Sequence, residues 1–187
     1  MSVLEFTATS IPGCFEVQAT IRADERGSFV KTMYAPEFDA RGLECDFVEE
    51  YFSKSHLNVI RGMHFQLPPH DHAKLVYCAV GAVLDVVVDL RVGSPTFKHS
   101  ISLELSAENA KMLYVPRGLA HGFQSLRDNT IMFYKVTSIH APNHDSGIRF
   151  DSFDALWTAS QPTMSARDLN LLTLEQFQSP FLYESNV

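Results

Sequence analysis

Apolar and polar residues alternate along much of this chain, with a period of two. Across residues 84–90 the even-numbered positions are Leu, Val, Val and Leu, while Asp85 and Asp89 occupy odd-numbered positions. Alternation of this kind is typical of a β-strand whose two faces have different surroundings. Alternation, or a run of β-branched and aromatic residues, predicts strands at four places: 74–80, 84–90, 101–105 and 131–137.

Glycine and proline interrupt the sequence at short intervals, and helical patterns are few. Short strands between regular turns predict an all-β fold, either a β-sandwich or a barrel. A short helix is expected over 35–42, ending at Gly42, and a second one near the C-terminus, beginning at about Ser165. Because no repeat, low-complexity tract or linker divides the sequence, we expect residues 1–187 to form a single domain.

Composition and charge narrow the class of protein. Hydrophobic residues make up 45% and charged residues 20%, as in ordinary globular proteins. The net charge of −7 argues against general binding to nucleic acid or an anionic membrane, because such binding depends on neutralising phosphates. Three scattered cysteines indicate free thiols, and the first residues lack the pattern of a signal peptide. We therefore expect a soluble cytoplasmic protein with neither a nucleic-acid partner nor a membrane partner.

Residues suited to chemistry gather on the predicted strands and at their ends. In a regular strand over 61–66, His64 and Gln66 share one face and Arg61 lies on the other, unless a bulge at Gly62 turns the arginine. Further candidates follow along the chain: Lys74, Asp85, His121 and Tyr134. We take this set as the candidate site.

Short motifs also follow one another in a distinctive order. They are Asp24-Glu-Arg-Gly27, Val59-Ile-Arg-Gly-Met-His-Phe-Gln66, Lys74-Leu-Val76, Gly81 to Arg91, Gly93-Ser-Pro-Thr-Phe97, Leu105-Ser-Ala-Glu-Asn109, Pro116 to Phe123, Tyr134-Lys-Val-Thr137 and Ser165-Ala-Arg-Asp168. Over roughly residues 11–168, this ordered set resembles the dTDP-4-dehydrorhamnose 3,5-epimerase family. The resemblance implies a cupin-type jelly roll and a homodimer that exchanges N-terminal strands. It also implies a nucleotide-diphosphate sugar as substrate, no metal and no dissociable cofactor.

The reaction of that family suits these residue types. It inverts the carbons that flank the ketone of a nucleotide-linked 4-keto-6-deoxyhexose, converting dTDP-4-dehydro-6-deoxyglucose to dTDP-4-dehydrorhamnose. A base removes a weakly acidic proton, positive charge stabilises the enolate oxygen, and an acid reprotonates the opposite face. By resemblance, the base is His64, whose imidazole Asp168 orients and stabilises. The acid is Tyr134, and Lys74 stabilises the enolate.

The same resemblance indicates substrate-binding positions, some of which depart from the family's pattern. They are Arg61, His121, Arg26, Lys31, Glu49, Gln66, Asp85 and Tyr51, with no specific role for Asp85. Lys31 stands where the family commonly has glutamate, and the segment that often reads Q-D-N-H is Glu49-Glu50-Tyr51-Phe52. A carboxylate accepts hydrogen bonds and an ammonium only donates. Because the thymine ring carries an N–H donor, Lys31 raises the hypothesis of a different nucleotide base.

Several assignments have a purely structural alternative. Ser165-Ala-Arg-Asp168 is also a helix-start pattern, in which Asp168 caps a backbone amide. Tyr134 also suits a buried core tyrosine with its hydroxyl satisfied. Lys74 suits a lysine at a strand end with its ammonium in solvent, and Arg26 suits a turn. The residue types alone leave both interpretations open.

Alternative functions remain open as well. The same chemistry at a single carbon, or on a CDP-linked or other nucleotide sugar, uses the same residues. His70-Asp-His72, with His121 as a later ligand, suggests a metal-dependent cupin oxygenase, although no glutamate lies between His72 and Glu104. A cupin that binds sugar nucleotides without catalysis is the third alternative. Such a binder needs no acid and base on opposite faces of the sugar.

Overall fold

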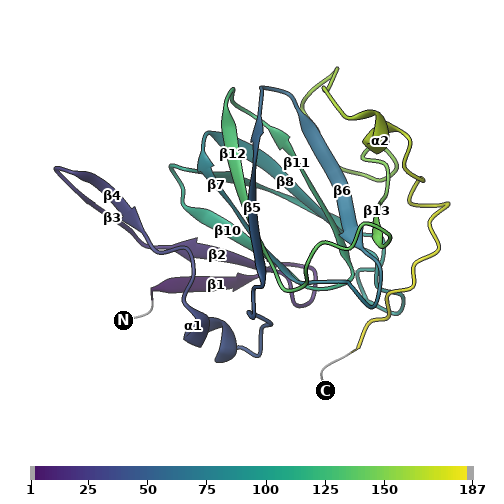
Figure 1. Cartoon of the computed structure of the whole chain (residues 1–187), viewed down its shortest axis with the longest axis horizontal. Helices are drawn as coiled ribbons and strands as arrows, with labels where there is room; N and C mark the ends of the chain where they lie inside the picture. Colours follow the sequence, from purple (N-terminus) through teal and green to yellow (C-terminus); the bar gives the residue numbers. More distant parts are fainter. Residues whose placement is uncertain (1–2, 185–187) are drawn as a thin grey trace.

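The computed structural model describes residues 3–184, which fold into two antiparallel β-sheets and a separate hairpin (Figure 1). The six-stranded sheet has the order β1 (Leu4–Ala8), β2 (Phe15–Ala19), β10 (Lys111–Val115), β7 (Lys74–Val80), β12 (Thr130–Val136), β5 (Glu49–Ser55). The five-stranded sheet has the order β13 (Asp145–Gly147), β6 (Ile60–Gln66), β11 (Leu119–Ser125), β8 (Ala82–Asp89), β9 (Ser100–Ser106). The hairpin is β3 (Ile21–Asp24) with β4 (Gly27–Val30), and the helices are α1 (Ala35–Asp39) and α2 (Ala166–Leu169).

The main hydrophobic core lies between the two sheets. Val83 and Val87 of β8 meet Leu113 of β10 and Met132 of β12 there, and all four side chains are fully buried. The prediction of an all-β sandwich with a few short helices, one near the C-terminus, is confirmed. Over the described residues, no helix is long and apolar enough to span a bilayer.

The outer face of the five-stranded sheet is covered by the C-terminal part of the chain, residues 148–184, which we call the covering segment. Val86 and Val88 of β8 point to this side and pack with Leu174 and Phe181 of the covering segment. The alternation along β8 therefore separates two buried layers rather than a core from solvent. This covering segment also carries α2 across the sheet beside β6 (Figure 1).

The outer face of the six-stranded sheet is covered only in part. Near β1, β2 and β10, Phe38 of α1 is fully buried against this face. Toward β12 and β5, an aromatic row runs across the sheet, because Phe133 contacts Tyr77 at 5.3 Å and Phe52 at 5.5 Å between ring centroids. Phe52 is 61% exposed, so this end of the face presents apolar rings to solvent.

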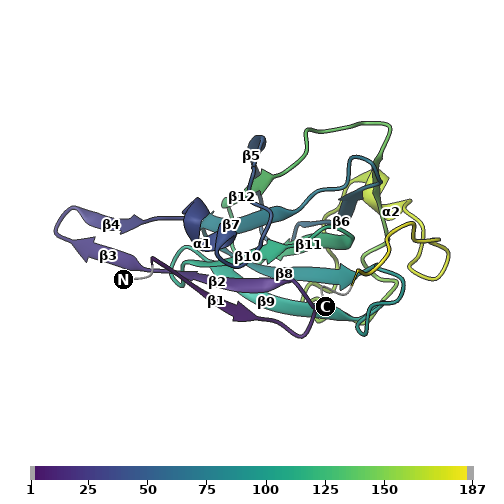
Figure 2. The same ribbon diagram turned by 90° about the horizontal axis from the view of Figure 1, so that it is seen from below.

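The hairpin of β3 and β4 extends away from both sheets in two perpendicular views (Figures 1 and 2). At its tip the guanidinium of Arg26 forms an ion pair with Asp24 at 2.6 Å, and both side chains are largely exposed. Phe29, on the returning strand, is 62% exposed. The hairpin thus has no hydrophobic core of its own.

The four strands predicted from alternation correspond to β7, β8, β9 and β12, with ends that differ by at most two residues. The first predicted helix ends earlier than expected, at Asp39, and Gly42 follows in a turn with φ of 64°. The second is a single turn of four residues, Ala166–Leu169. It stops there because the chain is extended again at Leu172, whose carbonyl accepts a hydrogen bond from the amide of Arg149 at 2.8 Å.

Candidate active site

A bulge in β6 brings two candidate residues to the same side of the sheet. His64 pairs with His121 and Arg61 pairs with Phe123. Between these two pairs β6 advances by three residues and β11 by only two, so β6 contains one extra residue. Gly62 adopts a φ of 135°, and a Cβ at this position would lie 2.6 Å from a backbone atom of β11. Only glycine fits such a close approach. The predicted alternative of a bulge that turns Arg61 is therefore confirmed.

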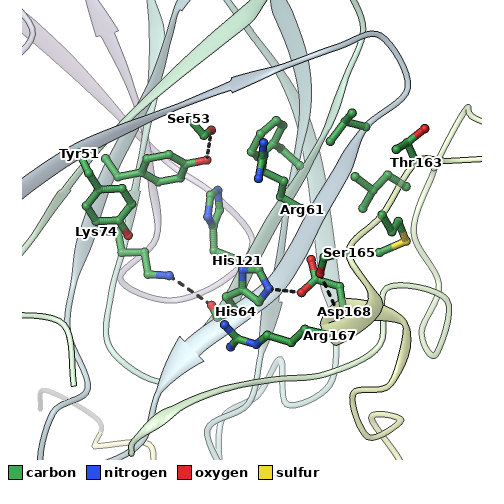
Figure 3. A pocket seen from close by; sticks show the side chains of 15 residues that line it. Tyr51, Ser53, Arg61, His64, Lys74, His121, Thr163, Ser165, Arg167 and Asp168 are labelled. Carbon is green, nitrogen blue, oxygen red and sulfur yellow. Dashed lines mark hydrogen bonds and ion pairs between the residues drawn. The ribbon is translucent and has the colours of Figure 1, made fainter. Parts of the chain in front are cut away.

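The bulge faces a cavity of about 580 Å³ (Figure 3). Its walls come from the five-stranded sheet, the six-stranded sheet and the covering segment, and the residues used below are Arg61, His64, His121, Tyr51, Ser53, Lys74, Tyr134, Thr163, Arg167 and Asp168. A second cavity of about 330 Å³ shares Tyr51, His64, Lys74 and Arg167 with the first. The two cavities therefore adjoin around these four side chains.

Asp168 reaches His64 although the two residues lie far apart in sequence. The covering segment is tied to the sheet on both sides of α2, by Ile60 N–H to the Thr163 carbonyl at 3.1 Å and by the bond at Leu172. Between these ties, Asp168 Oδ1 lies 2.8 Å from His64 Nε2. Figure 3 shows the carboxylate pointing from α2 to the imidazole.

The contacts of Asp168 also decide between its two predicted roles. The capping group is Ser165, whose hydroxyl accepts a hydrogen bond from the Asp168 amide at 3.0 Å. The Asp168 carboxylate instead receives the Gly62 amide at 3.4 Å and the His64 ring. The prediction that Asp168 itself is the cap is therefore wrong, because its side chain is directed across to β6. Burial favours a raised pKa for Asp168, but the His64 hydrogen bond and charge outweigh it and lower the pKa.

Lys74 is buried at the start of β7, with only 6% of its surface exposed. Its ammonium donates a hydrogen bond to the backbone carbonyl of His64 at 3.2 Å. Burial lowers the pKa of Lys74 to about 8, although the negative charges of Asp145 and Asp85 oppose this shift. The interpretation of Lys74 as a strand-end lysine with a solvated ammonium is therefore wrong. At neutral pH it is a desolvated cation with unused hydrogen-bonding capacity.

Asp85 and His121 form a second carboxylate–histidine pair, in which His121 lines the cavity and Asp85 is buried behind it. Asp85 Oδ2 lies 2.9 Å from His121 Nε2, and both side chains are almost fully buried. The other oxygen, Oδ1, is buried and has no hydrogen-bond partner in the described part of the chain. Burial raises the pKa of Asp85, while His121 and Lys74 act in the opposite direction. The hydrogen bond from His121 Nε2 to Asp85 orients the His121 ring.

Tyr134 approaches the cavity from the six-stranded sheet. Its hydroxyl lies 3.1 Å from Ser53 Oγ, and its ring is stacked against Tyr51. Burial raises the pKa of Tyr134, and the Ser53 hydrogen bond offsets only part of this rise. The phenol therefore keeps its proton at neutral pH, as a proton donor must.

Two guanidinium groups line the cavity. Arg61 is held by Ser55 Oγ at 3.1 Å and by the Lys54 carbonyl at 3.1 Å. Arg167 lies next to Asp168, lines both cavities, and forms an ion pair with Asp145 at 2.7 Å. Arg167 was not predicted as a site residue, although it belongs to the motif 165–168.

Ser53 and Thr163 were missed in the same way. Ser53 closes the segment 47–53, in which the family pattern has a serine, so that motif contained the signal. Thr163 lies in a stretch without a recognisable motif, and its place in the cavity follows only from the path of the covering segment.

Glu49 and Gln66 line the second cavity, and Gln66 also forms hydrogen bonds with neighbouring loops. Its side-chain amide donates to the carbonyls of His70 and Ile139 at 2.8 and 3.2 Å, and its oxygen accepts from the Ala141 amide at 2.6 Å. Glu49 accepts the backbone amide of His140 at 2.8 Å. Gln66 therefore joins two loops at the rim of the cavity.

The His70-Asp-His72 motif does not form a metal-binding arrangement with other residues. Over residues 3–184, no group of three or more His, Cys, Asp or Glu side chains is placed to hold a metal ion. The ring of His70 packs against the ring of His144, with centroids 4.4 Å apart, whereas His72 Nδ1 lies 3.1 Å from Gln66 Nε2. Burial lowers the pKa of His72 to about 3, which keeps this ring neutral.

Arg26 and Lys31 are not brought to the cavity of their own chain. Arg26 is at the tip of the hairpin, where it pairs with Asp24 in a turn. The ammonium of Lys31 lies 5.3 Å from the ring of Tyr34, next to α1. Neither residue is among those that line the two cavities.

Comparison with known proteins places this geometry in a family. A family model described as dTDP-4-dehydrorhamnose 3,5-epimerase matches residues 8–176. The chain belongs to the dTDP-4-dehydrorhamnose 3,5-epimerase family. A member from Shigella flexneri is 38% identical over 165 residues, which cover 87% of this chain and 91% of that protein.

Solved structures of related epimerases share the fold. A dTDP-6-deoxy-D-glucose-3,5-epimerase from Legionella pneumophila, in complex with dTDP-4-keto-L-rhamnose, superposes with a TM-score of 0.92 at 30% identity and covers 97% of this chain and 100% of its own. A 3′-monoepimerase from Streptomyces bikiniensis, in complex with dTDP-quinovose, gives a TM-score of 0.84 at 31% identity, over 89% of this chain and 86% of its own. The predicted family and the cupin-type jelly roll are thus confirmed.

Proposed function

We propose that this chain is an epimerase that inverts carbons 3 and 5 of a dTDP-linked 4-keto-6-deoxyhexose, forming dTDP-4-dehydrorhamnose from dTDP-4-dehydro-6-deoxyglucose. The observation that carries the proposal is the His64–Asp168 pair in one wall of the cavity with the Tyr134 phenol in another. The relatives named as 3,5-epimerases support the same reaction. We take residues 1–187 as one catalytic domain.

His64 acts as the base through a defined ring nitrogen. The Asp168 carboxylate only accepts hydrogen bonds, so His64 Nε2 carries the proton in their 2.8 Å contact. Nδ1 is then the nitrogen that takes the proton from the carbon next to the ketone. The lowered pKa of Asp168 keeps this carboxylate charged at neutral pH, and its charge stabilises the imidazolium that forms.

Lys74 stabilises the negative charge that appears on the ketone oxygen. Lys74 is a buried cation whose ammonium already bonds to the backbone of His64, so base and cation are held together. Preorganised donors in a desolvated site stabilise an oxyanion more than solvent does. Asp85 holds the His121 ring in place, and this ring lines the cavity as a contact for the sugar.

Tyr134 then reprotonates the carbon from the opposite face. His64 belongs to the five-stranded sheet and Tyr134 to the six-stranded sheet, so a sugar between them has base and acid on different sides. Every step in this scheme is a proton transfer, and it calls for no metal and no dissociable cofactor. Arg61 and Arg167 supply positive charge for the diphosphate, since guanidinium groups bind phosphate oxygens in pairs.

We also propose a homodimer that exchanges N-terminal strands. The exposed aromatic row at Phe52, and the exposed Phe29 of the hairpin, are apolar surfaces of the kind that mark protein contacts. Exchange would carry Arg26 and Lys31 to the cavity of a second copy, where Lys31 contacts the nucleotide. The three free cysteines agree with a cytoplasmic location.

Incubation with dTDP-4-dehydro-6-deoxyglucose in heavy water tests the reaction directly. Deuterium at carbons 3 and 5 of an inverted sugar is the expected result, read from mass and proton spectra. Deuterium at carbon 3 alone would make the protein a monoepimerase, as its Streptomyces bikiniensis relative is named. No deuterium, with tight binding of the sugar nucleotide, would refute catalysis. Turnover that disappears with a chelator would favour a metal-dependent cupin.

The nucleotide base is a separate question. Titration with dTDP and CDP measures which nucleotide binds more tightly to the protein that carries Lys31. Tighter binding of dTDP supports the dTDP-linked substrate. If CDP binds more tightly, the same deuterium experiment with the CDP-linked sugar decides the substrate.

A further inference from the structure

Tyr51 stacks against the proposed acid, Tyr134. In the antiparallel register, Tyr51 of β5 lies directly opposite Tyr134 of β12. The two rings stack, with centroids 4.9 Å apart and an interplanar angle of 17°. Tyr51 also lines both cavities, so it lies where they adjoin.

Three contacts fix the Tyr134 phenol in one orientation. The Tyr51 ring stacks on one face of the Tyr134 ring. The His121 ring forms a T-shaped pair with Tyr134, with ring centroids 6.1 Å apart and an interplanar angle of 74°, and Ser53 Oγ lies within hydrogen-bond distance of the Tyr134 hydroxyl. Tyr51 and Ser53 are two residues apart and project from the same side of β5, an edge strand. This one strand therefore sets both the plane of the ring and the direction of its hydroxyl. An asparagine at position 51 would have no ring to cover that face.

We propose that Tyr51 is a positioning residue that holds Tyr134 at the angle required to deliver its proton. The proposal rests on the proposed epimerase function. When the substrate C–H bond breaks, its proton passes to His64 and the electron pair forms the enolate. The enolate then takes a proton either back from His64, which regenerates the substrate, or from the Tyr134 hydroxyl, which inverts the carbon. His64 loses its proton to solvent and the Tyr134 phenolate regains one, so the cycle closes. Tyr51 acts on the second branch, because a tilted phenol reaches the enolate carbon less often.

The partition between these branches is measurable in heavy water. Recovered substrate that carries deuterium reports return by His64, and inverted product reports delivery by Tyr134. Loss of an aromatic stack is expected to raise the ratio of labelled substrate to product roughly three- to tenfold in Tyr51→Asn. The matched control is Tyr51→Phe, which keeps the ring and changes the ratio by less than about twofold. Because the readout is a ratio, a general loss of active protein cancels.

Two outcomes of this experiment would overturn the proposal. One is a ratio in Tyr51→Asn that equals the wild-type ratio. The other is an equal shift in Tyr51→Phe and Tyr51→Asn, which would assign the effect to a hydroxyl contact rather than to stacking.

A substrate-free measurement separates this proposal from the proposed function. Tyr134 ring signals in the NMR spectrum, assigned by their absence in Tyr134→Phe, report how freely the ring turns. Faster ring flips in Tyr51→Asn than in Tyr51→Phe and wild type are expected, because one covering face is removed. Identical ring motion in all three proteins would refute the role of Tyr51, whatever substrate the enzyme uses. Failure of the wild type to label any dTDP sugar would refute only the proposed reaction.

Discussion

Replacing Asp168 with asparagine separates the charge of this side chain from its shape. An amide oxygen can still accept the hydrogen bond from His64 Nε2, so the 2.8 Å contact is retained while the negative charge is lost. The carboxylate is 6% exposed and the imidazole 31% exposed, so the pair is only partly screened by solvent. Two unit charges about 4 Å apart interact by roughly 4 kcal/mol at an effective dielectric constant of 20.

Partial exposure of the imidazole reduces this energy, and we expect a loss of roughly 2–3 kcal/mol in transition-state stabilisation. That corresponds to a decrease of about 30- to 150-fold in kcat. The assay is the rate of deuterium incorporation at each carbon, measured by proton NMR with saturating substrate. Ser165→Ala is the control, because it removes the cap of α2 and leaves the carboxylate in place. An Asp168→Asn variant with more than about a third of the wild-type rate would refute the charge argument.

Three further predictions address other parts of the molecule. Tyr134→Phe should slow inversion while exchange into recovered substrate continues, as read from the same spectra; loss of both signals would contradict its assignment as the acid. Gly62→Ala should destabilise the fold by roughly 2–4 kcal/mol in urea unfolding, because its Cβ would meet backbone at 2.6 Å and its φ of 135° disfavours other residues. Burial favours a raised pKa for Asp89, but hydrogen bonds from Arg91, Ser94 and Thr96 outweigh it and lower the pKa. The charged carboxylate therefore stabilises the fold above about pH 4, and this stabilisation is lost as the pH falls through the folded-state pKa. Asp89→Asn should therefore destabilise at pH 7 by roughly 3–5 kcal/mol and weaken the dependence on pH below 4; an unchanged acid limb would contradict this.

The sequence predicts those parts of the molecule that depend on local patterns. β8 was predicted because its residues alternate, and His64 because it lies in a dense motif. By contrast, β5 reads Glu-Glu-Tyr-Phe-Ser-Lys-Ser and shows no apolar alternation, because it is an edge strand with a cavity on one side. Its register against β12 is a long-range property, so the stacking of Tyr51 on Tyr134 has no sequence signal.

The site depends on long-range contacts in the same way. Asp168 and His64 are 104 residues apart, and a helix-cap pattern was a reasonable local interpretation of Asp168. Family resemblance supplied their association, and only the path of the covering segment explains it physically. The hairpin is the opposite case: its motif Asp24-Glu-Arg-Gly27 matched the family pattern, but a single chain holds Arg26 away from the cavity.

The covering segment also makes the pairing of His64 with Asp168 a late event in the synthesis of this chain. Every strand of the six-stranded sheet, and His64, Lys74 and Tyr134, precede residue 137, so a growing polypeptide contains the proposed base, cation and acid before Asp168 leaves the ribosome. Asp168 reaches His64 as part of the covering segment, whose residues Leu174 and Phe181 pack on the outer face of the five-stranded sheet. A nascent or truncated chain that lacks this anchor holds a histidine without its counter-charge. On the proposed mechanism, such a chain has at most the reduced activity expected of Asp168→Asn, so full activity requires the covering segment.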